Sequence, residues 1–265
     1  MSLHRFFLKE QRLSDETDAL FALRLSDDDL RHAKVLRLFP GEHIAVIDAG
    51  SDYFECEISS FDDEMVVGIS SHREGRAEPF HVTLFQALAK GDKMETVIRH
   101  ATEVGASAFA PFSAARSVAK LDGAKADKKV ERWSAIAKSA AMQSGRELIP
   151  EVMPVTDLKG AIDRLSRFDA VVILWEEAGA TCSLSSALDS AKRLEHPDVA
   201  IVVGPEGGLS DEEIEALLAS NPYAGLVTLG PNILRTETAG IVGCALVSYE
   251  LGGMGASSGN QQGVA

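Results

Sequence analysis

Cysteine is scarce in this sequence, and its three copies, Cys56, Cys182 and Cys244, lie far apart without forming a Cys-x-x-Cys pair. A disulfide framework needs an even and clustered set of cysteines, and a zinc site needs closely spaced ligands. The spacing therefore excludes a disulfide scaffold and predicts no metal site. We expect the thiols to be reduced and mostly buried.

Long hydrophobic runs are also missing. The longest, residues 170–175, is far shorter than the roughly 20 apolar residues that cross a bilayer. The first ten residues are partly charged and lack the apolar core of a secretory signal. We therefore expect a cytoplasmic protein that does not contact a membrane. The 265 residues, 45% of them hydrophobic, are enough for one large domain or for an average domain and a small one.

Basic charge is in deficit, since 26 Lys and Arg face 40 Asp and Glu, which gives a net charge of −14. This balance argues against nucleic-acid binding, because a phosphate-binding surface is normally basic. Residues 81–150 are the exception, with 11 basic and 7 acidic side chains between two acidic segments. This middle segment is the only candidate for contact with a polyanion, although a solvated helix face would carry the same excess.

The first part of the chain, residues 1–72, is predicted to be a small β-rich domain. A capping box at residues 26–29 opens a short helix that should end near residue 39, before Pro40-Gly41. Three short strands are expected after it, at residues 44–47, 54–58 and 65–69. Polar residues 73–79 indicate a linker to a second domain at residues 80–251, and residues 252–265 a flexible tail.

The second domain alternates short apolar runs with segments of helical spacing. The runs lie at residues 82–87, 108–112, 152–154, 170–175, 199–203 and 226–229. The fifth has no polar alternation, as expected for a strand that is covered on both faces. This pattern predicts an α/β domain with a mostly parallel sheet and helices on both faces. Ligands of such sheets bind at the carboxyl ends of the strands.

One helix, expected at residues 127–144, has an apolar face and a basic face. The apolar face consists of Trp133, Ile136, Ala137 and Ala140. The basic side chains are Lys125, Lys128, Lys129 and Arg132. The apolar face should pack on the sheet, and the basic face is either solvated or in contact with phosphates.

Two loops that follow predicted strands combine glycine with charged residues. The first, residues 204–208 (Gly-Pro-Glu-Gly-Gly), precedes a helix that Ser210 and Glu213 should cap. It has neither the lysine of a Walker loop nor the glycine spacing of a dinucleotide fingerprint. The second, residues 229–239, leads into a helix so apolar that it must be buried. Its charged entrance is either a helix cap with an ion pair between Arg235 and Glu237 or part of a ligand site, and the first loop could be a simple tight turn between strand and helix.

Together these loops resemble the RsmE family of ribosomal RNA uracil-N3 methyltransferases, in the SPOUT superfamily of knotted methyltransferases. The resemblance runs from residue 4 to about residue 251. Supporting motifs are His4-Arg-Phe-Phe7, His32-Ala-Lys-Val-Leu-Arg37, Lys90, Lys93, Thr102-Glu-Val-Gly105 and Gln143-Ser-Gly-Arg146. The chain departs from the family at Asn232 and Leu209, where Arg and Phe are common.

The resemblance implies a PUA-like barrel that helps to bind RNA, followed by a SPOUT-type parallel sheet with a trefoil knot. It also implies S-adenosylmethionine as cofactor, 16S ribosomal RNA or the small ribosomal subunit as substrate, and a homodimer with the active site near its interface. The implied cofactor-binding residues are Leu174, Glu176, Val203, Gly204, Pro205, Glu206, Gly207, Gly208, Leu229, Gly230, Ile233, Leu234, Arg235, Thr236 and Ala239. The implied RNA-binding residues are Arg5, His32, Arg37, Lys90, Lys93, Lys128, Lys129, Arg132 and Arg146.

Methylation of a ring nitrogen requires that the reactants be positioned, that a proton be removed and that developing charge be stabilised. Arg235 is a candidate for binding the base or a flanking phosphate. Glu206 or Glu237 could accept the proton or orient Arg235, although a structural role for each carboxylate is equally open.

The helix after residue 239 is expected to pack against its symmetry mate, with Gly240 and Gly243 permitting a close approach.

Three other functions remain possible at this level. The chain could be a SPOUT 2′-O-methyltransferase for another ribosomal RNA or for transfer RNA, which the small N-terminal domain disfavours. It could be a non-catalytic RNA-binding assembly factor, which would require degenerate cofactor loops. An ordinary doubly wound adenine-nucleotide enzyme is disfavoured by the missing fingerprint.

Overall fold

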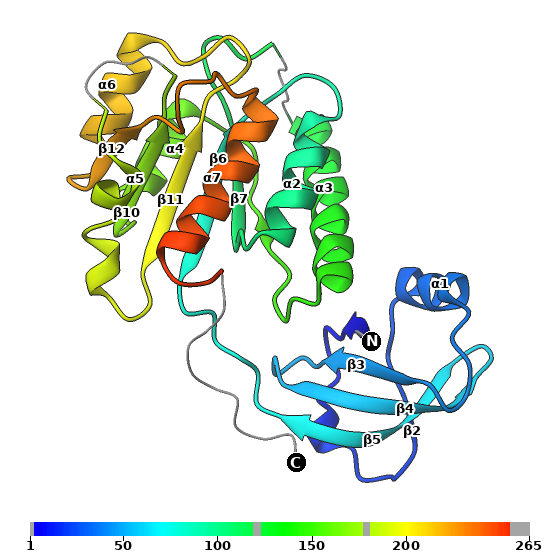
Figure 1. The fold of residues 1–265 in the computed structure, drawn as a ribbon. Coiled ribbons are helices and arrows are strands. Elements are labelled where there is room, and N and C mark those ends of the chain that lie inside the picture. The colour runs from blue at the N-terminus through cyan, green and yellow to red at the C-terminus, as the bar shows by residue number, and fades with distance from the viewer. Residues whose placement is uncertain (1–2, 119–122, 177–180, 255–265) are drawn as a thin grey trace. The chain divides into compact units, whose positions relative to one another are not determined.

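The computed structural model describes residues 3–118, 123–176 and 181–254, and it divides into two compact units (Figure 1). The first contains Met1–Ala77 together with Ala141–Ile149, and the second contains Glu78–Ala140 and Pro150–Ala265. The chain therefore leaves the first unit, returns to it for one short segment, and then completes the second unit. Nothing in the sequence pattern had indicated this return.

The first unit is built on a five-stranded sheet in the order β1-β3-β4-β5-β2. Its strands are β1 (His4–Phe7), β2 (Phe21–Ala22), β3 (His43–Ile47), β4 (Tyr53–Phe61) and β5 (Met65–Arg73), with a 3-10 turn at Leu13–Asp15 and one helix, α1 (Asp27–Leu36). β1 runs parallel to β3, and the other neighbours are antiparallel. In β4 the side chains of Phe54, Cys56 and Ile58 are buried, as their period of two predicted.

Helix α1 begins as its capping pattern predicts, because the Ser26 hydroxyl accepts the backbone N–H of Asp29 at 3.2 Å. It ends at Leu36, earlier than the expected position near residue 39. The reason is Arg37, which adopts a left-handed backbone with φ of 58° and caps the helix.

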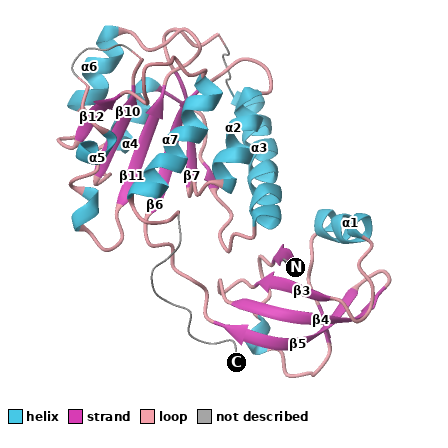
Figure 2. Cartoon of the chain, in the orientation of Figure 1, coloured by secondary structure: helices cyan, strands magenta, loops and turns pink. Residues whose placement is uncertain are grey.

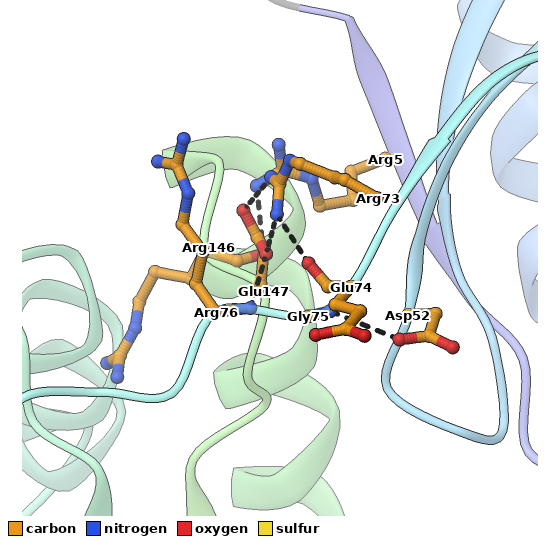
Figure 3. Close-up of polar contacts among 8 residues, drawn as sticks. All are labelled: Arg5, Asp52, Arg73, Glu74, Gly75, Arg76, Arg146 and Glu147. Atoms are coloured by element: carbon orange, nitrogen blue, oxygen red, sulfur yellow. Dashed lines mark hydrogen bonds and ion pairs between the residues drawn. The ribbon is translucent and has the colours of Figure 1, made fainter.

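Arginine side chains connect the segment Ala141–Ile149 to the sheet of the first unit (Figure 3). Arg73, the last residue of β5, forms a two-pronged ion pair with Glu147, in which Nη1 lies 2.9 Å from Oε2. The Arg73 guanidinium also lies over the Tyr53 ring, 4.1 Å from its centroid. Arg5 of β1 donates to the Arg146 carbonyl at 2.9 Å. Bidentate pairs of this kind are among the stronger polar contacts in proteins.

The same segment makes an apolar contact with the first unit, since Met142 packs against its buried core. Burial alone would raise the pKa of Glu147. The hydrogen bond from Arg73 and the backbone N–H of Arg76 outweigh that effect and hold the pKa below its ordinary value. The lowered pKa favours the charged form of Glu147 in its ion pair with Arg73. The segment Ala141–Ile149 is thus held to the sheet by this ion pair and by the packing of Met142.

The second unit is built on a seven-stranded parallel sheet in the order β12-β10-β11-β6-β7-β8, with β9 also paired to β7. Its strands are β6 (His81–Ala87), β7 (Ala108–Ser113), β8 (Glu151–Val152), β9 (Thr156–Asp157), β10 (Ala170–Leu174), β11 (Asp198–Val203) and β12 (Ala224–Val227). Its helices are α2 (Lys93–Glu103), α3 (Gly123–Ser144), α4 (Leu158–Leu165), α5 (Leu184–Ala187), α6 (Asp211–Ala219) and α7 (Thr236–Glu250), with a 3-10 turn at Ala191–Arg193.

Both faces of this sheet are covered by helices (Figure 2). In β11 the side chains of Val199, Ile201 and Val203 enter a core shared with α2, α3 and α7. Ala200 and Val202, which point the opposite way, enter a second core shared with α4 and α6. The predicted α/β architecture is confirmed, and so is the prediction that this strand is buried on both sides.

The described residues include no helix with the length and apolar character needed to cross a membrane.

All three cysteines are free thiols; Cys56 and Cys244 are buried and Cys182 is half-buried. Burial, with a smaller contribution from Glu55, raises the pKa of Cys56 to about 12, so this thiol is unreactive.

Helix α7 has one buried and one open face, although its sequence is apolar nearly all round. Gly240 and Gly243 lie on the buried face. A Cβ atom at Gly243 would lie 3.0 Å from Leu174 and 3.4 Å from Ile201, so this glycine lets α7 approach the sheet of its own chain. The expectation that the glycines face another copy is therefore wrong. The open face carries Leu246 and Tyr249, which are 37% and 65% exposed.

We predict that Gly243→Leu destabilises the fold, because the added side chain overpacks the contact between α7 and the sheet. The free energy of unfolding should fall by about 1–3 kcal/mol, measured by chemical denaturation. Ala245→Leu, at a half-buried position of the same helix, is the matched control and should leave stability nearly unchanged. Equal stability of the two variants would contradict the assigned packing of Gly243.

Candidate functional site

Three neighbouring parallel strands, β10, β11 and β12, end at the same edge of the large sheet. The loops that follow them surround a cavity of about 390 Å³. The cavity is lined by Lys93, Leu174, Trp175, Glu176, Val203, Gly204, Pro205, Glu206, Gly208, Leu209, Val227, Thr228, Leu229, Gly230, Pro231, Asn232, Ile233, Leu234, Arg235, Thr236 and Ala239. This is the edge at which parallel sheets bind their ligands.

The loop after β11 is a tight turn that its neighbours hold in place. Gly208 has a φ of +70°, a conformation that side chains rarely adopt, and its N–H bonds to the Pro205 carbonyl at 2.9 Å. Arg116, which follows β7, donates from Nη1 to the carbonyls of Gly207 and Leu209 at 3.1 and 3.2 Å. These hydrogen bonds tie the turn to itself and to the segment after β7.

The helix after this turn, α6, begins with the predicted capping box. Ser210 accepts the N–H of Glu213, and the Glu213 carboxylate accepts the N–H of Ser210 at 2.9 Å. The other oxygen of Glu213 accepts the N–H of Ala115 at 2.7 Å. This single buried carboxylate thus joins the end of β7 to the start of α6 and fixes the far side of the loop.

A chain of hydrogen bonds connects the sheet to the floor of the cavity. Gln86, at the end of β6 and almost fully buried, donates from Nε2 to the Thr236 hydroxyl at 2.9 Å. Thr236 donates in turn to the Gly204 carbonyl at 2.6 Å. A Cβ at Gly240 would lie 2.7 Å from the Gln86 Oε1 atom, so glycine at this position leaves room for the amide where it stands. The position of the Gly204 carbonyl is set by this relay.

Lys93 and Glu206, which line the cavity, meet a third charged side chain, Glu237, which was expected as a catalytic residue and is not among the lining residues. The Lys93 ammonium, in the first turn of α2, lies 2.9 Å from Glu206 Oε1 and 3.2 Å from Glu237 Oε2. Hydrogen bonding to Glu206, and then to Glu237, raises the pKa of Lys93 against the opposing effect of burial. Burial would raise the pKa of Glu206, but the hydrogen bonds from Lys93 and from the Lys90 backbone outweigh it and lower that pKa. Both partners are thus held in their charged forms.

Arg235 precedes α7 and is exposed. Among the residues that the structure describes, its side chain makes no ion pair or hydrogen bond, and Glu237 pairs with Lys93. The ion pair between Arg235 and Glu237, which was one interpretation of the sequence, is therefore not formed. The guanidinium lines the cavity and remains available to a ligand.

The structure brings the expected cofactor residues together. All of them line the cavity except Gly207, whose missing Cβ would face Arg116 at 3.1 Å rather than the cavity. The lining residues that had not been expected are Lys93, Trp175, Leu209, Val227, Thr228, Pro231 and Asn232. Five of these seven directly adjoin expected residues in the chain and Val227 lies two positions from Leu229, so these six could have been included. Lys93 had been expected only as an RNA contact, and no local signal pointed to its place in the cavity.

The residues expected to bind RNA do not form one group. Lys129 and Arg132 of α3 reach Glu95 of α2, at 3.6 and 2.7 Å, so a largely buried carboxylate offsets their charge. The exposed members are His32, Arg37, Lys90, Lys128 and, despite its pairing, Arg132. Arg5 and Arg146 belong to the first unit, where Arg5 is bonded to the Arg146 backbone.

Comparison with known proteins places this site in a family. Residues 76–248 match a family model described as an RNA methyltransferase domain. The chain is 38% identical to the ribosomal RNA small subunit methyltransferase E of Bacillus subtilis (strain 168), over 94% of this chain and 97% of that protein. It is 35% identical to the protein of the same name from Mycobacterium bovis, over 83% of each chain.

Two solved structures share the whole architecture. One is the ribosomal RNA small subunit methyltransferase E of Neisseria gonorrhoeae bound to S-adenosylmethionine, with a TM-score of 0.76, 29% identity, and coverage of 93% of this chain and 97% of that one. The other is a putative methyltransferase of Legionella pneumophila in complex with the same cofactor, with a TM-score of 0.78, 28% identity, and coverage of 94% and 98%. The chain thus belongs to the ribosomal RNA small subunit methyltransferase E (RsmE) family.

Proposed function

We propose that this protein transfers a methyl group from S-adenosylmethionine to N3 of a uridine in the 16S RNA of the small ribosomal subunit. The observation that carries the proposal is the cavity at the ends of β10, β11 and β12, with two carboxylates and two cations at its wall. A methyl transfer to a protonated nitrogen needs a shaped cofactor site and a group that removes a proton, and this edge of the sheet offers both. The same proposal has the protein act in the cytoplasm, where a bacterial ribosomal RNA substrate would be met.

The cavity fits the cofactor in size and chemistry. Its volume of about 390 Å³ lies within the roughly 300–1,000 Å³ typical of small-molecule sites. Apolar side chains such as Val203, Leu229 and Leu234 can cover the adenine ring, while glycine backbone atoms are open to hydrogen bonding. The carboxylates of Glu176 and Glu206 suit a ligand that carries a sulfonium and an ammonium group.

S-adenosylmethionine supplies an electrophilic methyl group, and the chain's own residues do the rest. The relay from Gln86 through Thr236 holds the Gly204 carbonyl, and Arg116 holds the rest of that loop, so the cofactor site is shaped before binding. Arg235 is exposed at the cavity and can bind the base or a neighbouring phosphate. Glu206 and Glu237 are the groups near the cavity that can orient the substrate or take its proton.

The product and the cofactor site can be tested together in cells that lack the protein. Mass mapping should show loss of N3-methyluridine from small-subunit RNA and its return with the wild-type gene. Ala239→Leu, which adds bulk at the cavity wall, should fail to restore it and should weaken cofactor binding in calorimetry by about tenfold or more, roughly 1.4 kcal/mol.

The matched control is Thr238→Leu, on the exposed side of the same helical turn, which should restore methylation fully. Unchanged N3-methyluridine in cells without the protein would refute the proposed reaction. Normal cofactor affinity in a folded Ala239→Leu protein would refute the proposed cofactor site.

RNA binding is proposed to involve the open part of the basic face of α3. Lys125 and Lys128 are exposed and have no ion pair among the described residues, whereas Lys129 and Arg132 are engaged with Glu95. Arg5, His32, Arg37, Lys90 and Arg146 remain proposed as further contacts. The acidic remainder of the chain would repel phosphate, so the few uncompensated cations should carry much of the electrostatic attraction.

We predict that the double change Lys125→Glu and Lys128→Glu weakens binding to small-subunit RNA and lowers the slope of log affinity against log salt by about one to two. The double change Lys159→Glu and Arg167→Glu alters the net charge equally at exposed sites outside the basic segment. That control should change the slope much less. Identical slopes for the two variants would mean that the basic face of α3 is only solvated.

The protein is further proposed to act as a homodimer through the open face of α7. Leu246, Tyr249, Ile233 and Met254 are large apolar side chains left exposed on this helix and on the segments that flank it. The helix follows directly on Arg235 and Glu237, so a second copy seated on this face would border the cavity. A two-fold axis would bury the same patch on both copies.

Leu246→Asp is expected to shift the protein to monomers in sedimentation experiments and to lower methyl transfer in parallel, because an unpaired charge would be buried at the interface. Val35→Asp places the same charge at another exposed apolar position, in α1, and should leave the oligomeric state unchanged. A monomeric wild-type protein with full activity would contradict the dimer.

A further inference from the structure

The two carboxylates beside Lys93, those of Glu206 and Glu237, are held differently, and this difference assigns them separate roles. We propose that Glu237 accepts the proton of the substrate nitrogen, and that Glu206 holds Lys93 in position beside it. This inference rests on the proposed function, since it concerns a nitrogen that must lose a proton to be methylated. It also changes the role of Lys93 from a phosphate contact to a positioning residue.

Glu206 is anchored twice. Its Oε1 atom accepts a hydrogen bond from the Lys90 backbone N–H at 3.1 Å and lies 2.9 Å from the Lys93 ammonium. These donors stabilise the carboxylate, and the pKa of Glu206 is accordingly lowered. A carboxylate that is held by two donors and made less basic is a poor proton acceptor but a good anchor.

Glu237 is anchored once. Its Oε2 atom lies 3.2 Å from the Lys93 ammonium, which is its only ion-pair partner among the described residues. The side chain stands in the first turn of α7, next to Arg235 and Thr236 of the cavity lining, and is 21% exposed. Among the described residues no backbone group is bonded to this carboxylate, so it can turn toward a substrate without breaking a backbone contact.

Glu237 itself is not among the lining residues, but it directly follows Thr236, which is, and the titratable groups that line the cavity fit this role less well. Lys93 is protonated, and its raised pKa keeps it so. Arg235 cannot give up its proton in a protein. Glu176 is exposed after the end of β10 and makes no ion pair with Lys93 among the described residues. Glu237 pairs with Lys93 and stands two residues after Arg235 in the chain.

The proton and the electrons balance in a single transfer. The N3–H proton moves to a carboxylate oxygen of Glu237, and the electron pair left on N3 forms the new bond to the methyl carbon. The carbon–sulfur bond breaks, and its electron pair stays on sulfur as a neutral thioether. Glu237 becomes neutral while Lys93 stays paired with Glu206, and the proton later leaves to water.

The decisive variants are Glu237→Gln and Glu206→Gln, measured in single-turnover methylation with saturating cofactor. Glu237→Gln should slow the transfer by about a hundredfold or more, the usual effect of losing a general base, without altering cofactor affinity in calorimetry. Glu206→Gln should slow it by about tenfold, because the base is displaced but present. Glu103→Gln, an exposed change on α2, should behave as wild type.

Substrate acidity separates a proton acceptor from a structural group. RNA that carries 5-fluorouridine at the target has a more acidic N3–H and depends less on a base. It should restore Glu237→Gln far more than Glu206→Gln. A Glu237→Gln rate within threefold of wild type, or equal rescue of both variants, would overturn the assignment.

A second measurement needs neither cofactor nor turnover. The pKa of Lys93, followed by NMR of labelled lysine in the cofactor-free protein, should fall in both variants and should fall further in Glu206→Gln, whose carboxylate contributes most. A Lys93 pKa that is unchanged in both would refute the cluster. If the wild-type protein formed no N3-methyluridine, the proposed function would fail while this titration could still succeed, so the two failures are distinguishable.

Discussion

A parallel sheet that is buried on both faces constrains everything else in the second unit. Its strands can bury polar side chains only where these find hydrogen-bond partners, as Gln86 does with Thr236, because an unpaired buried polar group costs several kcal/mol. Chemistry is therefore confined to the strand ends, and the order of the strands decides which ends meet. Because β12, β10 and β11 are neighbours, the loops after them converge on one cavity although they are far apart in the chain.

The loops of this cavity were accessible to sequence reasoning because each is one contiguous motif. Glycines, a capping box and an apolar strand before them mark residues 204–213, and the structure gathers all but one of the expected cofactor residues around the cavity. The parallel sheet could likewise be predicted from uninterrupted apolar runs such as that of β11. The trefoil knot was implied by the resemblance, the domain boundaries were predicted from the polar residues 73–79, and both stay predictions.

Properties that depend on distant partners could not be predicted. The place of Lys93 between Glu206 and Glu237 joins three separate segments, and the pairing of Arg132 with Glu95 joins two helices. Helix α7 shows a different limit. Because its residues are apolar nearly all round, periodicity could not distinguish the side that packs on the sheet from the side left open, and Gly243 was assigned to the wrong one.

The discontinuity of the first unit has a consequence for how the two halves of this chain can be separated. The sheet of residues 4–73 holds Met142 and Glu147, which arrive at the end of α3, a helix whose earlier turns belong to the other unit. Removing residues 1–77 would therefore strip α3 of the partners of its last turn, and the excised piece alone would lack part of its own core. Each unit is made of two separate stretches of sequence, with a stretch of the other unit between them. Cutting or recombining the chain at a single linker therefore cannot yield two intact units.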